Sequence, residues 1–126
     1  MKNKFFYLIC FALSFFIFQS LHSNEIFNFN VTEIEITQDG NLFKGRNGGE
    51  AFTNDGISIK AKNFEYNKSS LLLKASEEVD YKDEKRNIII KADQISYFKS
   101  EEKIFAKVNV NILDKNKNIE IKADEI

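Results

Sequence analysis

The sequence of 126 residues has no proline and no tryptophan, and it contains a single cysteine and a single histidine. These two residues, Cys10 and His22, lie within residues 1–23, which have the features of a cleaved signal peptide described below. Without them, the remaining chain can form no disulfide, and it lacks the side chain that most often serves as a general base or metal ligand. These absences argue against catalysis and against a metal site.

The sequence also lacks a phosphate-binding loop and an excess of basic residues, and these two absences exclude further classes of function. The glycines at positions 45, 48 and 49 are not followed by the Lys-Ser/Thr pair of a phosphate-binding loop. Beyond residue 23 the chain has 16 basic and 19 acidic side chains, a net charge of −3, whereas a nucleic-acid partner requires a basic face. We therefore expect no enzymatic activity, no cofactor and no nucleic-acid partner, and by elimination we expect a binding or scaffolding role.

The N-terminal segment is organised like a secretory signal peptide. Lys2 and Lys4 make its start positive, and the 14 residues from Phe5 to Phe18 are apolar except for Ser14. Leu21-His22-Ser23 then supplies a small residue at the expected cleavage site. An uncleaved anchor is the alternative, but a helix needs about 20 apolar residues to span a bilayer. We predict export, with residues 1–23 removed and residues 24–126 forming one domain.

The rest of the chain is built on an internal repeat of 31 residues. Residues 57–87 and 88–118 align without a gap and agree at 11 of 31 positions. A third copy begins at Ile119 and matches residues 88–95 at six of eight positions, so we expect the last repeat to be incomplete. A looser copy comes first, at an offset of 30, with Phe27, Phe29, Ile34 and Ile36 corresponding to Ile57, Ile59, Phe64 and Tyr66.

Apolar residues alternate with polar ones inside each copy, as from Ile57 to Ala61, and this period of two is typical of half-buried strands. The next apolar residue, Phe64, follows Ala61 after three residues instead of two. The same step recurs from Ala92 to Ile95 and from Ala123 to Ile126. An odd step turns a side chain to the opposite face, so we predict a bulge or corner at residues 62–63, 93–94 and 124–125.

Turn chemistry separates the predicted strands. The segments 39–41 and 54–56 read Asp-Gly-Asn and Asn-Asp-Gly, which favour hairpin turns because glycine accepts a positive φ at little cost. The segment 47–49 reads Asn-Gly-Gly and predicts a bulge or a longer loop. The carboxylate pairs Glu77-Glu78 and Glu101-Glu102 are expected next to turns on the solvated surface. The Asp and Asn residues of the turns lack the spacing of a calcium loop.

Repeats of this size cannot bury an apolar face alone and must stack. About 100 residues provide three to four short rungs of sheet with one interior and two open ends. The predicted fold class is therefore all-β, either a β-solenoid or a stacked-repeat β-jelly-roll in which two apolar faces lie opposite each other.

Three strings within the repeats carry a resemblance to a known family: residues 88–97 (IIIKADQISY), residues 119–126 (IEIKADEI) and residues 57–66, where Lys62 replaces the Asp. This pattern resembles the OstA-like family of lipopolysaccharide-transport proteins, which includes the periplasmic bridge protein LptA and the N-terminal domain of the outer-membrane assembly protein LptD. The glycine that precedes the valine of the family's next strand is absent here. Glu77-Glu78-Val79 and Val108-Asn109-Val110 stand in its place.

The resemblance implies a V-shaped, open-ended β-jelly-roll in the periplasm that shields the acyl chains of lipid A in an apolar groove. It also implies that domains of this kind join to other lipopolysaccharide-transport components by pairing their edge strands, and it is compatible with association at the outer membrane. The groove candidates that follow from it are Ile59, Phe64, Tyr66, Leu73, Val79, Ile90, Ile95, Tyr97, Ile104, Val110 and Ile121. The same alternation equally predicts that these residues fill a dry core.

Two questions stay open at this stage. The chain fits both a stand-alone LptA-type protein and the first part of an LptD-type barrel protein. A structural β-repeat module of a secreted or surface protein, without lipid cargo, is the alternative from a different class.

Overall fold

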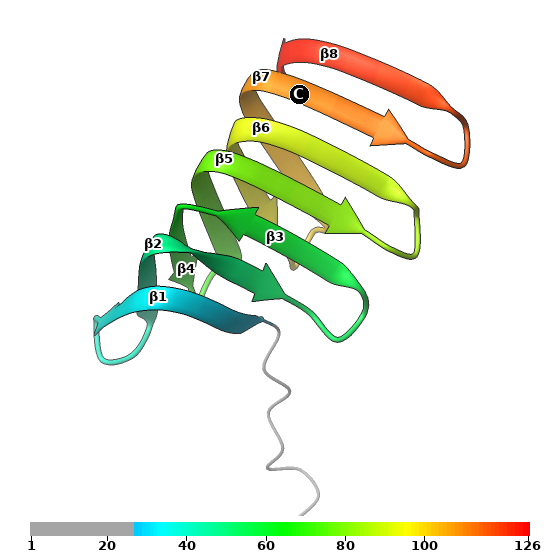
Figure 1. Ribbon diagram of the computed structural model, residues 1–126. Coiled ribbons are helices and arrows are strands. Elements are labelled where there is room, and N and C mark those ends of the chain that lie inside the picture. The colour runs from blue at the N-terminus through cyan, green and yellow to red at the C-terminus, as the bar shows by residue number, and fades with distance from the viewer. Residues whose placement is uncertain (1–26) are drawn as a thin grey trace, which may run out of the picture.

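The computed structural model describes residues 27–126, and the predicted signal peptide at residues 1–23 lies outside them. The strands are β1 (Asn28–Thr37), β2 (Leu42–Phe52), β3 (Ile57–Ala61), β4 (Asn63–Asn67), β5 (Leu72–Asp83), β6 (Ile88–Phe98), β7 (Lys103–Asp114) and β8 (Ile119–Glu125) (Figure 1). All regular elements of this part of the chain are strands, which confirms the predicted all-β class. Among the same residues we find no helix with the length and hydropathy needed to cross a membrane.

The strands form one antiparallel sheet in the order β1-β2-β3-β5-β6-β7-β8 (Figure 1). β4 continues the row that β3 begins on the other side of Lys62, and it pairs with β2 and β5. Short turns join neighbouring strands, and the predicted turns at residues 39–41 and 54–56 are present, with φ of 86° at Gly40 and 95° at Gly56. Because the sheet order follows the chain order, β1 and β8 form the two edges of the described sheet.

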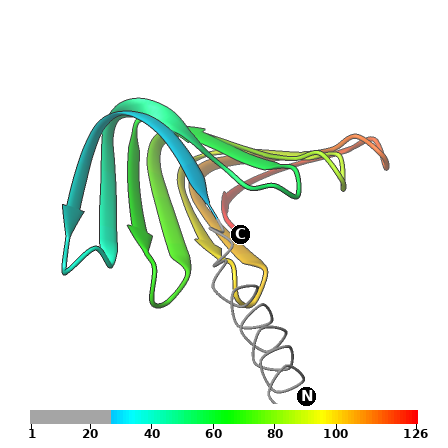
Figure 2. The ribbon, with the colours of Figure 1, turned by 90° about the horizontal axis from the view of Figure 1, so that it is seen from below.

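Every row of the sheet bends about halfway along its length, which gives the sheet the shape of a V (Figure 2). The bend lies where the strand pairing is irregular, between Ser76 and Val79 in β5 and between Lys91 and Gln94 in β6. Together with Lys62, which separates β3 from β4, these irregularities lie at or beside two of the predicted corners. Segment 47–49, for which we predicted a bulge or a loop, lies inside β2 at this bend.

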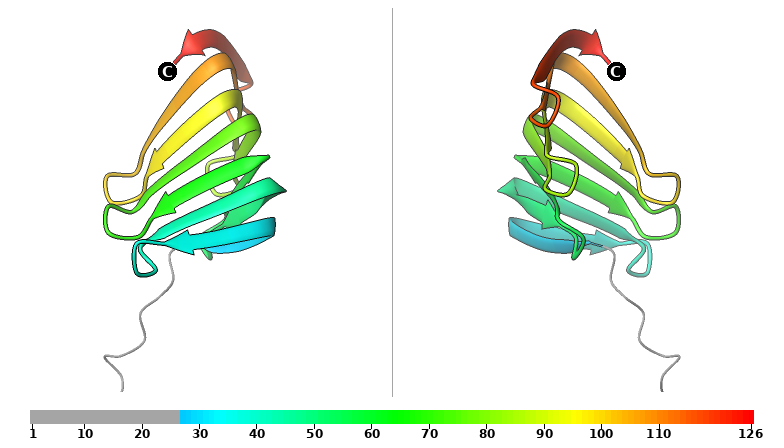
Figure 3. Two further views of the ribbon diagram at one scale, coloured as in Figure 1. Left: turned by 90° about the vertical axis from the view of Figure 1, so that its left-hand side faces the viewer. Right: turned by 90° about the vertical axis from the view of Figure 1, so that its right-hand side faces the viewer.

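The bend divides the sheet into two halves that we call the first arm and the second arm. The first arm contains residues 33–46, 63–76 and 94–107, and its turns are at 38–41, 68–71 and 99–102. The second arm contains residues 28–31, 49–61, 79–92 and 110–123, and its turns are at 53–56, 84–87 and 115–118. The rows lie one above another from β1 to β8 in both arms (Figure 3).

Backbone hydrogen bonds connect successive turns at both tips. In the first arm Lys99 N donates to Leu71 O at 3.1 Å, and in the second arm Glu84 N donates to Gly56 O at 3.0 Å. These bonds satisfy polar backbone groups that lie outside the strand ladders. They also fix the spacing of the turns, so that residues far apart in the chain lie at defined heights in the stack.

The core lies between the arms, on the face of the sheet that we call the inner face. Strand pairing places the alternating apolar residues of neighbouring rows opposite one another, as in the adjacent set Ile59, Tyr81 and Ile90. Ile59 and Tyr81 are almost completely buried, and each side chain of this size contributes about 1.5–3 kcal/mol by its burial. The stability of the sheet therefore depends on contact between the inner faces of the two arms.

Candidate functional site

All of the predicted groove residues lie on the inner face, and they come from both arms. Phe64, Tyr66, Leu73, Ile95, Tyr97 and Ile104 belong to the first arm, and Ile59, Val79, Ile90, Val110 and Ile121 belong to the second arm. Nine of them are at most 7% exposed. Ile104 is half-buried and Ile121, in the edge strand β8, is 47% exposed. The structure thus brings all of these residues onto one continuous apolar surface.

Aromatic side chains fill the space between the arms near β1. Phe29, in the second arm, stacks on Phe43 of the first arm with ring centroids 4.2 Å apart. Phe27 approaches Tyr66 and Tyr97 edge-on, at 5.1 and 5.9 Å. Such pairs contribute about 0.5–1.5 kcal/mol each beyond their buried area. The cluster therefore joins the arms and closes the interior on the β1 side.

Phe27, Phe29 and Phe43 were not among the predicted groove residues. The offset of 30 between the first, looser copy and the next one was the available signal, because it aligns Phe27 and Phe29 with Ile57 and Ile59. Phe29, like Ile57 and Ile59, lies on the inner face of the second arm, and Phe27 is buried in the same core. The alignment of the first copy with the second therefore predicts inner-face positions for Phe27 and Phe29.

The apolar inner face continues to both edges of the sheet, where its residues are exposed to solvent. At the β1 edge Ile34 and Ile36 are 54% and 61% exposed, and they lie opposite Gly45 and Phe43. At the β8 edge Ile119, Ile121 and Ile126 are 44–47% exposed. Exposed side chains of this size that continue a core surface mark a place where another apolar group can be received.

The buried part of the inner face is almost free of charge. Asp83, at the tip of the second arm, is the one charged side chain among the buried residues of the described chain, and it pairs with Arg86. The phenols of Tyr66, Tyr81 and Tyr97 are polar but neutral, and burial raises the pKa of each of them above the usual value. Between the tips and the bend, the inner face is therefore chemically suited to hydrocarbon chains and unsuited to ions.

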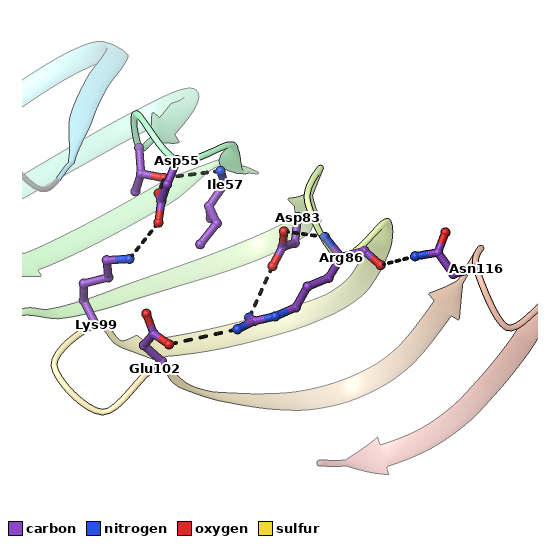
Figure 4. A network of polar contacts seen from close by, with 8 residues as sticks. Asp55, Ile57, Asp83, Arg86, Lys99, Glu102 and Asn116 are labelled. Carbon is purple, nitrogen blue, oxygen red and sulfur yellow. Dashed lines mark hydrogen bonds and ion pairs between the residues drawn. The ribbon is translucent and has the colours of Figure 1, made fainter.

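A polar network occupies the tips of the arms, and sequence analysis did not predict it (Figure 4). Nζ of Lys99, in a turn of the first arm, lies 3.2 Å from Oδ2 of Asp55, in a turn of the second arm. Arg86 and Glu102 make a second, longer contact of 4.0 Å between the arms. Both contacts join residues from different repeats, so no local sequence signal marks them.

The Asp55 carboxylate is held on two sides. The hydroxyl of Thr53 donates a hydrogen bond to it, and that hydroxyl in turn accepts a hydrogen bond from the backbone N–H of Ile57 at 3.2 Å. The Thr53 hydrogen bond and the ammonium of Lys99 lower the pKa of Asp55 below its ordinary value. Asp55 is therefore ionised, and paired, at neutral pH.

A depression of about 410 Å³ lies away from the inner face, on the outside of the first arm. Lys44, Glu65, Lys74 and Ser96, which are neighbours across β2, β4, β5 and β6, contribute its polar lining. Within residues 27–126 no three Asp, Glu, His or Cys side chains gather in an arrangement that would hold a metal ion. A hydrocarbon ligand would find no apolar surface in this outer depression comparable to the inner face.

Comparison of the chain with protein-family models found no match, and comparison with curated proteins found no significant similarity.

Proposed function

We propose that the chain is a lipopolysaccharide-transport domain that shields lipid A acyl chains on the inner face of a V-shaped, stacked-repeat β-jelly-roll of the OstA-like type. The observation that carries the proposal is the inner face itself, which is apolar along both arms and ends in exposed isoleucines at both edges. A core built only for stability gains little from apolar side chains at these solvent-exposed edge positions. Ile34 and Ile36 at one edge and Ile121 at the other instead extend the apolar surface beyond the buried core.

The free energy involved is large enough to require such a surface. An acyl chain of about a dozen methylene groups costs about 0.8 kcal/mol per group to keep in water, on the order of 10 kcal/mol for the chain. A continuous apolar face lowers this cost along the whole path, whereas separate pockets would leave barriers between them. The strings at residues 57–66, 88–97 and 119–126, which suggested the family, supply much of the inner face.

The edges of the sheet support the proposal that the domain joins other transport components through its edge strands. β1 and β8 each have one side that pairs with no strand among residues 27–126, and an unpaired strand can receive another by β-augmentation. Joining the β8 edge of one domain to the β1 edge of another is a head-to-tail contact that builds open chains. It would cover the exposed isoleucines and extend the inner face from one domain to the next. The expected site of action is the periplasm, in contact with other lipopolysaccharide-transport components.

Photo-crosslinking from two neighbouring positions in β8 tests the proposal. Ile121 points to the inner face and Lys122, the matched control, points outward, with exposed fractions of 47% and 76%. A photoreactive amino acid placed at Ile121 should cross-link to labelled lipopolysaccharide, and the same group at Lys122 should not. Equal cross-linking at both positions, or cross-linking only at Lys122, would contradict a role for the inner face.

A structural role without lipid cargo is the second candidate, and one observation favours it. The inner-face residues from β3 to β6 are closed to solvent, and aromatic side chains fill the space between the arms. A module that needs only a stable core would have this packing. It would bind no lipopolysaccharide, so the cross-linking experiment separates the two functions.

A further inference from the structure

The closed interior raises the question of how a lipid would enter it. Acyl chains reach the inner face between the tips of the arms only if the tips move apart. Among residues 27–126 two ion pairs connect the turns of one arm to those of the other, Asp55–Lys99 and Arg86–Glu102. Their position makes them the polar contacts that such a movement must break (Figure 4).

Further contacts position the two cations, Arg86 and Lys99. Arg86 donates to Asp83 from its backbone N–H at 3.1 Å and from its guanidinium at 3.4 Å, and Asp83 is 5% exposed. Asn116, from the next turn of the second arm, donates to the carbonyl oxygen of Arg86 at 3.1 Å. Lys99 lies over the ring of Tyr97, with Nζ 5.8 Å from the centroid, and its side chain is largely buried. The Asp55–Lys99 pair is therefore preorganised, whereas Arg86–Glu102 is a longer and more exposed contact, with side chains 61% and 62% exposed.

The pairs also lie directly above the apolar surface. A space of about 200 Å³ beside them is lined by Ile57 and Tyr97 of the inner face and by six charged residues, Asp55, Asp83, Lys85, Arg86, Lys99 and Glu102. Separation of the pairs would uncover these two inner-face residues first. The network thus stands between solvent and the proposed acyl-chain surface.

We propose that Asp55–Lys99 and Arg86–Glu102 form a latch that holds the arms together and controls lateral entry of acyl chains between their tips. The inference rests on the proposed function, because it assigns a regulation to the same inner face. In the latched state the interior is closed between the tips, and loss of the pairs shifts the arms towards a separated state that admits hydrocarbon from this side. The latch acts by holding two surfaces together and touches no acyl chain itself.

The first test measures the distance between the arm tips without any lipid. The chain beyond residue 23 has no cysteine, so spin labels can be placed at two exposed turn positions through Asn54→Cys and Ser100→Cys. In the Asp55→Asn/Glu102→Gln background the distance between labels should increase and its distribution should broaden. Glu101→Gln is the matched control, because Glu101 pairs with Lys103 at the start of β7, in the same arm, and does not bridge the arms.

The second test measures entry of hydrocarbon. Uptake of lipopolysaccharide with a fluorescent acyl chain should be about two- to fivefold faster in the latch variant, the effect expected from losing interactions of this kind. Added salt should accelerate uptake by the unmodified chain, since it screens exposed charges, and should have less effect on the variant. A cleavable bis-maleimide that links the two thiols introduced by Asn54→Cys and Ser100→Cys should block uptake until the linker is cleaved.

The outcomes separate the two proposals. Lipid uptake that is normal in every variant, together with an unchanged distance between the labels, overturns the latch and leaves the proposed function standing. An increased distance in the latch variant with no lipid uptake by any form of the protein overturns the proposed function, and with it the gating role. An equal response in Glu101→Gln would show that charge in general, and not the bridge between the arms, produces the effect.

Discussion

Phe29 and Phe43 stack at 4.2 Å across the interior, although Phe29 belongs to the second arm and Phe43 to the first. The contact joins the part of β1 on one side of the bend to the part of β2 on the other side. It therefore fixes the angle between the arms at this end of the sheet. Nothing equivalent closes the β8 end of the described sheet, where the inner-face isoleucines remain exposed. The two ends of the described interior therefore differ in their aromatic filling, which is present only on the β1 side, whereas exposed isoleucines lie at both edges.

Replacing Phe29 by alanine should destabilise the domain by about 2–3 kcal/mol, because it removes a partly buried ring and its contacts with the first arm. Urea unfolding followed by circular dichroism measures the change. Phe105→Ala is the control, since Phe105 lies on the outer face and is 46% exposed, and it should cost less than about 1 kcal/mol. A loss for Phe29→Ala no larger than that of the control would contradict the role of the stack.

Val108→Gly should stabilise the domain by about 1 kcal/mol. Val108 lies at the bend with φ of 65°, a left-handed conformation that is strained for a β-branched residue and costs glycine nothing. The relief of strain exceeds the greater chain entropy that glycine brings to the unfolded state. Val110→Gly, two residues further on, removes a buried side chain without relieving a positive φ and should destabilise the domain. A destabilised Val108→Gly variant would show that the bend carries no such strain.

Gly49→Ala should be strongly destabilising, by up to about 3 kcal/mol. A Cβ atom at Gly49 would lie 2.5 Å from the backbone oxygen of Asn30 and 2.7 Å from Cα of Val31, and backbone atoms cannot easily move away. Gly45→Ala is the comparison, because its Cβ would meet only the side chain of Val31, at 3.1 Å or more. The thermal unfolding temperature should fall much further for Gly49→Ala than for Gly45→Ala, and equal shifts would contradict the close approach of β1 to β2.

Alkaline pH should unfold the domain through its tyrosines. Tyr66, Tyr81 and Tyr97 are the tyrosines beyond residue 23, and burial raises the pKa of all three above the ordinary value of 10.0. Because the unfolded chain ionises first, stability is complete below pH 10.0 and decreases as the pH rises above it. Tyrosinate absorbance should therefore appear together with loss of sheet signal. Titration of all three phenols in a folded domain near their ordinary pKa would contradict the buried positions.

Strand periodicity was sufficient to predict the inner face. The alternation from Ile57 to Ala61 and the odd step to Phe64 have direct structural counterparts, because side chains alternate across a sheet and only a break at Lys62 keeps both segments on one face. The same reasoning applies to Ile90 and Ile95 in β6. This alternation depends only on residues that are neighbours in the chain. It predicts the structure correctly where one face of the strand is buried in a core.

The bend in β5 could not be predicted in the same way. Glu77 and Glu78 were expected beside a turn, yet they lie within β5 at the bend, with φ of 64° and 54°. Their backbone conformation is one that glycine normally supplies, and the sequence has no glycine there to indicate it. The pairing of β5 with β6 is interrupted between Ser76 and Val79, where these two residues lie.

The stacking repeat predicted two open ends, but the latch and the exposure of individual edge residues could not be predicted from the sequence. Asp55 and Lys99 are 44 positions apart, and their pairing depends on the relative height of turns in different arms. Ile121 is exposed because its strand lies at an edge, whereas Ile90, which has the same position in the preceding repeat, is buried between two neighbours. Equivalent residues of a repeat can therefore differ in function through their place in the stack.

Binding of lipopolysaccharide by the purified domain, compared with binding of the same molecule after removal of its acyl chains, tests the central claim most directly. The domain should bind intact lipopolysaccharide and free lipid A saturably, and deacylated lipopolysaccharide at least about tenfold more weakly, because the apolar inner face contacts hydrocarbon and not sugar. Native mass spectrometry measures all three complexes under one condition. Failure to bind lipid A, or equal binding of the intact and deacylated forms, would contradict the account.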